Sequence, residues 1–489
     1  MTVLGEIALW LALLFATWSA VVAPIGAAAG RHALVASAAR GLAATSLMTV
    51  LAAAGVIAAL ARRDYELAFA AATTSHDLPT VYAIAALWAA PAGAALVLAL
   101  PVAAAGAVVA LSSRRASPWA IALVALAVLL CLGPLCFTNA LYERLPWVAA
   151  DGQGLAPRLQ SAYLLIVPPL SAIGYGLLVP YLLLEVGSLV VRHDDAHSRR
   201  LARQVALLGW AVLGASALVA LRWAYLDPVW WDQWPERVLT DGSLVAWLTV
   251  GGCLAATGRR AVAALAVPAV AAVAVAASVS PLGLLEGASD ALRGTAGAAL
   301  VVLTLALAAV AWRAHPPAPS TTRGGRASTL ARRVGLGFVA AGVVAVAVGL
   351  AGRGARVDRE ARLETGRAAE LTDPRGARWR LVSQGVSRYQ SRNRDVTALA
   401  VMVGPAGDAA SLVTAERWQV LDRRGQTRGE PVSVAGVRTT PTMDVRLLLE
   451  TDVAGSADVR VGFEPFALLV WIGGTLLLVG GAAALAVER

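Results

Sequence analysis

The sequence predicts an all-α polytopic membrane protein of about eleven transmembrane helices, with a small β domain inserted before the last helix. Of its 489 residues, 58% are apolar, and the mean hydropathy is +0.67. Several segments exceed the roughly 18 apolar residues that mark a candidate membrane span. One polar stretch, 353–462, alternates apolar and polar residues with a period of two, which favours strands.

The apolar segments give the predicted domain organisation. A helical transmembrane domain covers 1–352, the β domain covers 353–462, and a C-terminal transmembrane helix lies within 463–489. The predicted spans are about 5–27, 41–61, 82–111, 118–137, 161–191, 204–222, 243–257, 261–280, 295–312, 334–352 and 464–486. The first is expected to be a retained helix and not a signal peptide, because its apolar run is long and no Arg precedes it.

Prolines and glycines mark the interruptions. The third and fifth spans are long and are expected to be tilted or broken at prolines, namely Pro91, Pro101, Pro168, Pro169 and Pro180. The stretch 313–333 is rich in Pro, Ser, Thr, Gly and Arg, so it is predicted to be a loop.

Arginine predicts the orientation and excludes some partners. The net charge is +10, and every basic side chain other than His is Arg. The loops on one side of the predicted spans hold fifteen Arg and the short loops opposite hold seven. The richer side is expected to be cytoplasmic, which leaves the β domain outside the cytoplasm in a plasma (inner) membrane. Loop arginine explains the basicity without a nucleic-acid partner.

Few residues are typical of a reactive centre. The three Cys form no CxxC pair, and no paired-His spacing indicates a metal site, so neither a catalytic residue nor a metal ligand is predicted. Glu185 is the clearest charge within a span. It is either a functional group or one half of a structural pair with Arg192.

An aromatic stretch, LRWAYLDPVWWDQWPERVL (221–239), stands out between two apolar runs. Four Trp lie within twelve residues, together with Tyr and Asp side chains. Such rings are stable at the membrane–water boundary, so an ordinary interfacial belt is one interpretation. The other is a platform on which a flat hydrophobic ligand such as a porphyrin stacks, with Arg222 and Arg237 pairing its carboxylates. The candidate binding residues are Arg222, Trp223, Tyr225, Asp227, Trp230, Trp231, Asp232, Trp234 and Arg237.

His76 is the one histidine predicted on the β-domain side of the membrane. It is a candidate axial haem ligand or acid–base group, and a helix cap or a solvated loop residue is the alternative.

The order of several segments resembles the CcmF-type cytochrome c haem lyases, membrane proteins that handle haem through a tryptophan-rich WWD motif. GEIALWLALLFATWSAVVAPIGA resembles the first helix of that family, and LYERLPWVAADGQGL with QSAYLLIVPPLSAIGYGLLVPY resembles its DGQGLNP loop and following helix. WAYLDPVWWDQWPER occupies the place of the WWD loop, and VRVGFEPFALLVWIGGTLLLVGG resembles the last helix.

The chain departs from the family at its histidines. Val167 stands at the HPP histidine, and the HAF histidine position falls near Leu285. No histidine follows the WWD-like loop near 253–257, and Pro91-Ala92-Gly93-Ala94 replaces the HEGS after Trp88. The sequence is therefore identified as a divergent member that lacks the family histidines.

The resemblance implies a cytochrome c maturation factor, and the enzyme class it suggests is a haem lyase subunit. Such a factor receives b-type haem, held transiently, from a haem carrier. It presents the haem to the CxxCH thiols of apocytochrome c, beside membrane lipid and other maturation proteins. The platform would act by proximity, and the chemistry would belong to the cofactor and the apocytochrome. Two alternatives remain: a haem-free scaffold for a maturation complex, and a small-molecule transporter.

Overall fold

The computed structural model describes residues 2–112, 117–190, 196–231, 243–255, 265, 266, 269, 323–391, 393–407, 409–422, 424–453 and 455–486. Within them, eight helices are long and apolar enough to cross a membrane. These are α1 (Thr2–Ala28), α2 (His32–Arg62), α5 (Pro91–Leu111), α6 (Pro118–Phe137), α7 (Ala162–Val190), α8 (Ala196–Leu226), α13 (Arg323–Gly352) and α14 (Ala467–Ala486). Shorter helices are α3 (Ala68–Thr73), α4 (Thr80–Ala89) and α10 (Ser243–Ala255).

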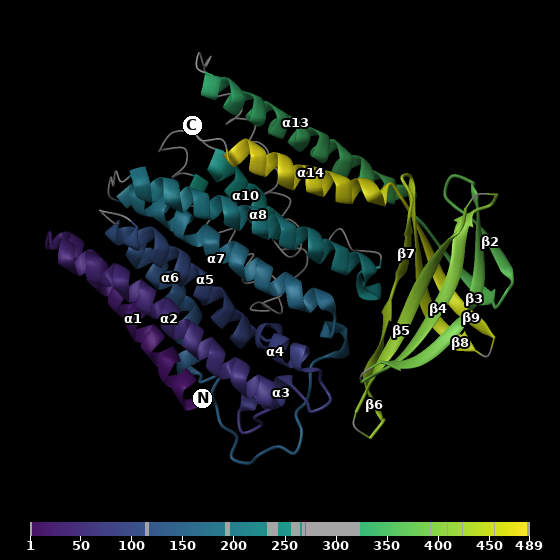
Figure 1. Ribbon diagram of the computed structural model, residues 1–489, viewed down its shortest axis with the longest axis horizontal. Coiled ribbons are helices and arrows are strands. Elements are labelled where there is room, and N and C mark those ends of the chain that lie inside the picture. The colour runs from purple at the N-terminus through teal and green to yellow at the C-terminus, as the bar shows by residue number, and fades with distance from the viewer. Residues whose placement is uncertain are drawn as a thin grey trace.

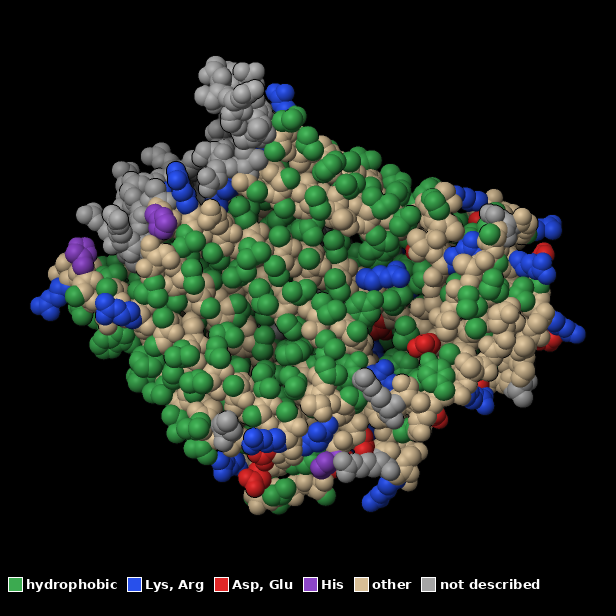
Figure 2. Space-filling model, viewed as in Figure 1, with side chains coloured by type: hydrophobic (Ala, Val, Ile, Leu, Met, Phe, Trp, Pro, Cys, Tyr) green, Lys and Arg blue, Asp and Glu red, His purple; other side chains and the backbone are tan. Residues whose placement is uncertain are grey.

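The predicted fold class is confirmed, whereas the count of eleven spans is not. A helical bundle occupies one part of the molecule and a β domain precedes the last helix (Figure 1). Hydrophobic side chains cover the visible face of the bundle, and charged ones gather on the β domain and at the helix ends (Figure 2). The predicted spans 261–280 and 295–312 lie outside the described residues, except for residues 265, 266 and 269.

Prolines act differently in the two long predicted spans. The third is split, because Ala90 is extended before Pro91 and Pro91 starts α5 in the favoured first position of a helix. The fifth span was expected to be tilted or broken, and of these the break is wrong, since α7 runs through three prolines. Pro168 has no N–H for the carbonyl of Leu164, and the indole Nε1 of Trp88 donates to that oxygen at 2.8 Å instead. A neighbouring helix thus replaces the hydrogen bond that the proline removes.

The predicted loop 313–333 is also corrected in part, because residues 323–333 form the first turns of α13. Glycines bring α13 and α14 close together: a Cβ placed at Gly342 would lie 2.8 Å from the carbonyl oxygen of Gly473. Small residues at such a crossing let two helices pack backbone to backbone. Residues Arg353–Ala355 form the short helix η3, which leads from α13 into the β domain.

The β domain consists of two antiparallel sheets. One has the order β1 (Val357–Glu364), β9 (Ser456–Pro465), β8 (Met443–Val453), β7 (Gly436–Thr439). The other has the order β2 (Ala368–Thr372), β3 (Arg378–Ser391), β4 (Arg394–Pro405), β5 (Ser411–Leu421), β6 (Thr427–Val434). Leu399, Val401 and Val403 are buried at a spacing of two, as expected for one face of a strand, and pack with Leu447 and Val459 of the other sheet.

The β domain lies at one end of the bundle, here called the β-domain end (Figure 1). The chain enters the domain from α13 and leaves it into α14, whose last residues lie at the opposite end (Figure 1). Two arginines of the second sheet bind the loop between α6 and α7. Arg428 Nη2 donates to the oxygen of Gly152 at 2.8 Å, and Arg394 donates to the oxygen of Gln160.

Candidate functional site

The aromatic stretch begins on the last turns of α8 and continues into a short 3-10 helix, η2 (Pro228–Trp230). Asp227 precedes η2, and its Oδ1 accepts from the N–H of Val229 at 3.0 Å, a side-chain cap for that turn. Pro228 occupies the first position of η2, where a missing N–H has no consequence. The candidates Asp232, Trp234 and Arg237 lie outside the described residues.

Trp231 is held by the β domain. Its side chain is 2% exposed, and its Nε1 donates to Oδ2 of Asp358 at 3.2 Å. Its carbonyl oxygen accepts from Nη1 of Arg356 at 2.9 Å and from Nη1 of Arg446 at 3.0 Å. In this conformation the indole face is covered by protein, so Trp231 fastens the stretch to the sheet and presents no open stacking surface.

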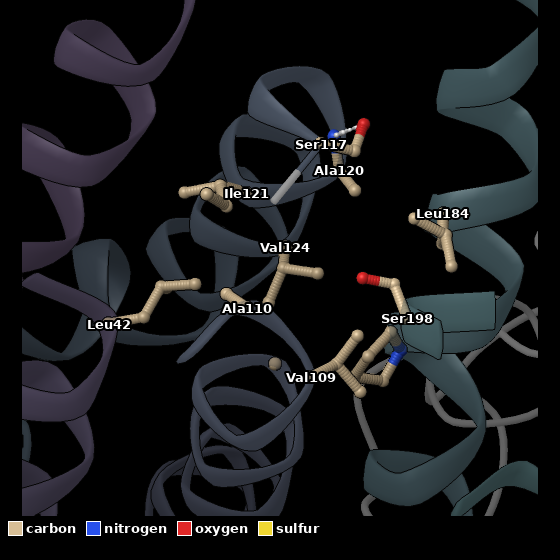
Figure 3. Close-up of a pocket in the computed structure, with 11 residues that line it drawn as sticks. Leu42, Val109, Ala110, Ser117, Ala120, Ile121, Val124, Leu184 and Ser198 are labelled. Carbon is tan, nitrogen blue, oxygen red and sulfur yellow. Dashed lines mark hydrogen bonds between the residues drawn. The ribbon is translucent and has the colours of Figure 1, made fainter. Parts of the chain in front are cut away.

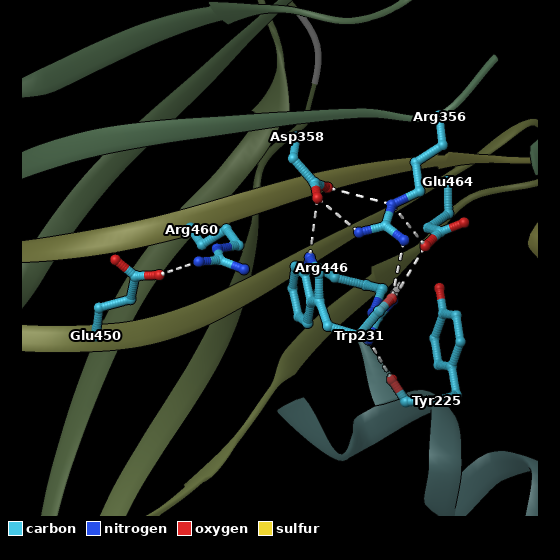
Figure 4. Close-up of polar contacts among 8 residues, drawn as sticks. All are labelled: Tyr225, Trp231, Arg356, Asp358, Arg446, Glu450, Arg460 and Glu464. Atoms are coloured by element: carbon cyan, nitrogen blue, oxygen red, sulfur yellow. Dashed lines mark hydrogen bonds and ion pairs between the residues drawn. The ribbon is translucent and has the colours of Figure 1, made fainter. Parts of the chain in front are cut away.

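Arg446, on β8, is the centre of this contact (Figure 4). It is fully buried, and its guanidinium lies 3.9 Å from the ring centroid of Trp231 and 4.4 Å from that of Tyr225. Nη2 donates to the oxygen of Tyr225 at 2.6 Å, and Nη1 donates to Oε1 of Glu464 at 3.0 Å. One cation therefore joins the end of α8 to both β8 and β9.

Four charges balance at this contact. Glu464 Oε1 also lies 3.3 Å from Nε of Arg356, and Nη2 of Arg356 lies 2.6 Å from Oδ2 of Asp358. Two guanidiniums thus face two carboxylates. A buried charge is tolerated only when it is paired and hydrogen-bonded, and this arrangement meets both conditions. We call the six residues the loop–sheet joint: Tyr225, Trp231, Arg356, Asp358, Arg446 and Glu464 (Figure 4).

Asp444 extends the joint on its helix side. Its Oδ2 accepts from the hydroxyl of Tyr225 at 2.9 Å, and the residue is fully buried. Burial raises the pKa of the Asp444 carboxyl to about 6, against the hydrogen bond from Tyr225, which lowers it.

The other aromatic candidates are less enclosed. Trp223 is half-buried and stacks on Tyr163, with centroids 5.9 Å apart and planes 10° from parallel. Trp230 is half-buried against the cluster formed by the ends of α8 and α14. Arg222 lies 5.2 Å from the ring centroid of Tyr225 and 5.6 Å from that of Trp471. Arg222, Trp223 and Trp230 are each partly exposed.

An apolar cluster connects Trp223 to the region of His76. It contains Leu78, Leu155, Leu159, Leu164 and Trp223. Its members come from α4, α7, α8 and the loops before α4 and α7, so buried apolar packing extends from Trp223 to Leu78, two residues after His76. The loop before α7 is also tied to the stretch directly, because Nη2 of Arg158 lies 3.3 Å from Oδ2 of Asp227.

His76 lies in the turn between α3 and α4 and pairs with Asp151. Its Nδ1 is 3.1 Å from Oδ1 of Asp151, and its side chain is 33% exposed. The ring stacks edge-on against Tyr65, with centroids 4.9 Å apart. His76 is thus neither a helix cap nor a freely solvated loop residue.

Several residues of the site were not predicted. Arg356, Asp358, Arg446 and Glu464 come from the β domain and hold the aromatic stretch, and Asp151 orients His76. Of these residues, Arg446 could have been suspected from the sequence, because its charge lies among apolar residues in the segment VRLLLE.

Two other features of the bundle add no site. A small cavity among α2, α5, α6, α7 and α8 is lined mainly by apolar side chains such as Val109 and Ile121 (Figure 3). Glu185 is 2% exposed and lies 3.3 Å from Nε of Arg199, which favours the structural-pair interpretation, whereas Arg192 lies outside the described residues. The described part of the chain holds no group of three His, Cys, Asp or Glu side chains placed for a metal ion.

No family model matches the chain. Among curated proteins it is similar to the cytochrome c-type biogenesis protein CcmF of Pseudomonas fluorescens, with 29% identity over 251 residues, which is 50% of this chain and 38% of that protein. CcmF of Pseudomonas aeruginosa is 30% identical over 39% of the chain and 30% of its own length. The matched part therefore spans less than half of each of these relatives.

A solved structure extends the likeness to the whole chain. The cytochrome c haem lyase CcmF superposes with a TM-score of 0.72 at 15% identity, covering 99% of this chain and 97% of that one. At 15% identity, the match shows that the two chains share a fold. Together with the sequence matches, it confirms the expected resemblance: the chain is similar to CcmF-type cytochrome c biogenesis proteins in sequence over about half of its length and in fold over 99% of it.

Proposed function

We propose that the chain is a cytochrome c maturation factor that binds haem at the β-domain end and presents it for covalent attachment to the CxxCH thiols of an apocytochrome. The relatives supply the reaction class, since they are named cytochrome c-type biogenesis proteins and a haem lyase. The observation that carries the proposal is the loop–sheet joint. It fixes the end of α8, and with it Trp223, Trp230 and Arg222, in one position.

The residues fit a porphyrin. Trp223 and Tyr163 form a stacked pair beside an apolar cluster, which suits the hydrophobic plane of the ligand. Arg222 and Arg158 supply cations for its two carboxylates, and His76 supplies an imidazole on the same end. Bound haem would supply the vinyl groups to which the thiols add.

The protein's own contribution is positioning. Rings and cations held by a rigid joint would keep a bound planar ligand in one orientation. The thiols would then meet vinyl groups that are already positioned, which lowers the entropy cost of the reaction. Trp231 acts indirectly in this proposal, because its ring is used in the joint. The partners are an apocytochrome, a haem carrier and other maturation proteins. The β-domain end faces the extracytoplasmic side of the inner membrane, in line with the arginine-poor loops there.

The experiment compares haem retention and cytochrome c production in Trp223→Ala, Trp230→Ala and Trp147→Ala. Trp147 is the control, because it is a 69% exposed tryptophan in the loop between α6 and α7. We expect the first two variants to lose most of the haem that co-purifies with the wild type, and to yield less covalent cytochrome c. Normal haem content and normal cytochrome c in a Trp223→Ala/Trp230→Ala double variant would refute the platform.

The haem-free scaffold is a second candidate. The observation in its favour is that Val167, whose aliphatic side chain cannot ligate iron, stands at the family's HPP histidine position and is 2% exposed. Capture of a maturation partner by a wild-type preparation that never shows a haem spectrum would favour this candidate.

A further inference from the structure

A concavity lies where α13 meets the β domain. Its lining residues are Leu350, Arg353, Gly354, Arg356 and Asp358, and its volume is about 600 Å³. No atom lies within 4 Å of the position that a Cβ would take at Gly354, so this residue leaves the concavity open. Three of the five lining residues are charged, which favours a ligand that is charged itself.

The sequence of α13 places this concavity at the level of lipid headgroups. No charged side chain occurs from residue 334 to residue 352, and Arg353 follows directly. At about 1.5 Å per residue this run is about 28 Å long, which matches the hydrocarbon core of a bilayer, about 30 Å thick. The start of α14 lies at the same level, because a Cβ added at Gly352 would clash with the carbonyl oxygen of Pro465. Arg353 therefore lies at the boundary where lipid phosphates are found.

The apolar part of α13 offers a surface for acyl chains. Val344, Val348 and Leu350 are 62%, 42% and 41% exposed, and Leu350 also lines the concavity. In Figure 1, α13 lies beside α14 at the edge of the bundle. A ligand with a charged head and apolar chains would therefore contact the concavity and the exposed side of the helix together.

The charges at the concavity favour an anion. Its lining holds two guanidiniums, Arg353 and Arg356, and one carboxylate, Asp358, so one positive charge is in excess. Glu464 and Arg446 do not change this sum, because the four charges of the loop–sheet joint cancel. Electrostatic attraction therefore favours a ligand with one negative charge.

Arg356 is already fixed in place. Its side chain is 10% exposed, and Nη2 and Nε donate to the two carboxylate oxygens of Asp358 at 2.6 and 3.2 Å (Figure 4). A guanidinium held in this way loses little rotamer freedom when a ligand binds beside it. Guanidiniums also match phosphate oxygens in geometry, because their N–H groups lie in one plane and can form two parallel hydrogen bonds.

We propose that the concavity binds the phosphate of an acidic phospholipid, in the leaflet on the β-domain side, between Arg353 and Arg356. A lipid such as phosphatidylglycerol carries the single negative charge that the lining favours, and its acyl chains fit the exposed side of α13. A zwitterionic lipid brings a cation as well, so it gains less. Because Arg356 also donates to the carbonyl oxygen of Trp231, the bound lipid would contact a residue of the loop–sheet joint. The inference does not depend on haem binding.

The first test counts lipids on the full chain. The detergent-solubilised protein is stripped of lipid, mixed with phosphatidylglycerol, phosphatidylcholine or glycerol 3-phosphate, and measured by native mass spectrometry. We expect one tightly held phosphatidylglycerol, and weaker binding of the other two compounds. Arg353→Gln should weaken phosphatidylglycerol binding by about 5- to 10-fold. Arg375→Gln is the matched control, because Arg375 is exposed, lies over the ring of Phe466 just before α14 and does not line the concavity.

The second test fills the concavity and keeps both arginines. Gly354→Phe places a large side chain where no atom lies within 4 Å, so the fold should tolerate it. Without lipid, this variant and the wild type should melt at the same temperature. Phosphatidylglycerol should then raise the melting temperature of the wild type but not that of Gly354→Phe. This variant also decides the question if Arg353→Gln does not fold.

Three results would overturn the proposal. Equal affinity for phosphatidylglycerol and phosphatidylcholine would show that the lipid's charge is not recognised. Equal binding of phosphatidylglycerol by the wild type, Arg353→Gln and Gly354→Phe would place the lipid elsewhere. Glycerol 3-phosphate that binds as tightly as phosphatidylglycerol would make the concavity a site for a soluble phosphate and refute the lipid.

Discussion

Replacing Arg446 by Met is expected to open the loop–sheet joint. Arg446 is fully buried, bonds to Tyr225, Trp231 and Glu464, and lies between two aromatic rings. Met fills a similar volume but leaves Glu464 with one guanidinium in place of two. Breaking a buried ion pair by removing one partner costs about 3–5 kcal/mol. The open fraction of the joint should therefore rise by roughly two to three and a half orders of magnitude.

The neighbouring ion pair Arg460–Glu450 provides the control. It joins the same two strands, and its charged atoms lie 3.0 Å apart, the distance found for Arg446 and Glu464 (Figure 4). Its side chains are 37% and 33% exposed, so Arg460→Met should cost only about 0–1 kcal/mol. The distance is equal in the two pairs, whereas Arg446 is buried and has further contacts to Tyr225 and Trp231, so the comparison measures the effect of burial and these contacts together.

Hydrogen exchange of the β8 and β9 amides, followed by mass spectrometry on the full chain in detergent, measures the opening free energy. The variants are Arg446→Met, Glu464→Gln, their combination and Arg460→Met. The double variant restores charge balance, so we expect it to cost less than the sum of the two single changes. Additive costs, or an Arg446→Met effect no larger than that of Arg460→Met, would refute the reasoning.

Two further changes probe the same contact. Because the pKa of Asp444 is raised to about 6 in the folded state, deprotonation between pH 4 and pH 7 should lower stability, by an upper bound of about 3 kcal/mol at roughly 1.4 kcal/mol per pKa unit. Between pH 4 and pH 7, the melting temperature of Asp444→Asn should therefore fall less than that of the wild type. The control Asp458→Asn should behave like the wild type. Equal changes of melting temperature with pH in all three proteins would contradict the raised pKa of Asp444. At Gly462 a Cβ would lie 3.0 Å from Cζ2 of Trp231, so Gly462→Val should cost about 1–3 kcal/mol by overpacking, whereas Gly354→Ala, with no atom within 4 Å, should be neutral in the same melting assay.

The fold followed from local patterns. Long apolar runs predicted helices, and alternation in segments such as DVTALAVMV predicted strands, because both periodicities are set by residues close in sequence. The outcome at prolines was less predictable. Whether Pro168 breaks a helix depends on Trp88, which is far away in the chain and donates to the carbonyl that the proline leaves without a partner.

The site was predictable only in part, for a related reason. The aromatic stretch could be recognised from its four closely spaced Trp residues, and its position near the β domain was expected. The partners of Trp231 were not, because Arg356 and Arg446 are set beside it by the tertiary fold at sequence separations of 125 and 215 residues. The role of Asp151 was hidden in the same way, because its partner His76 lies 75 residues away in the sequence.

The β domain is fastened to the bundle at separate places, through α13 and α14, through the loop–sheet joint, and through Arg428 on the loop before α7. Because α13 and α14 are packed backbone to backbone, they act as a single stem. Loosening the joint would therefore leave the domain attached at two places, by this helix pair on one side and by Arg428 and Arg394 on the loop before α7 on the other. The loss of Arg446 should then change the local opening of β8 and β9 and not the attachment of the whole domain.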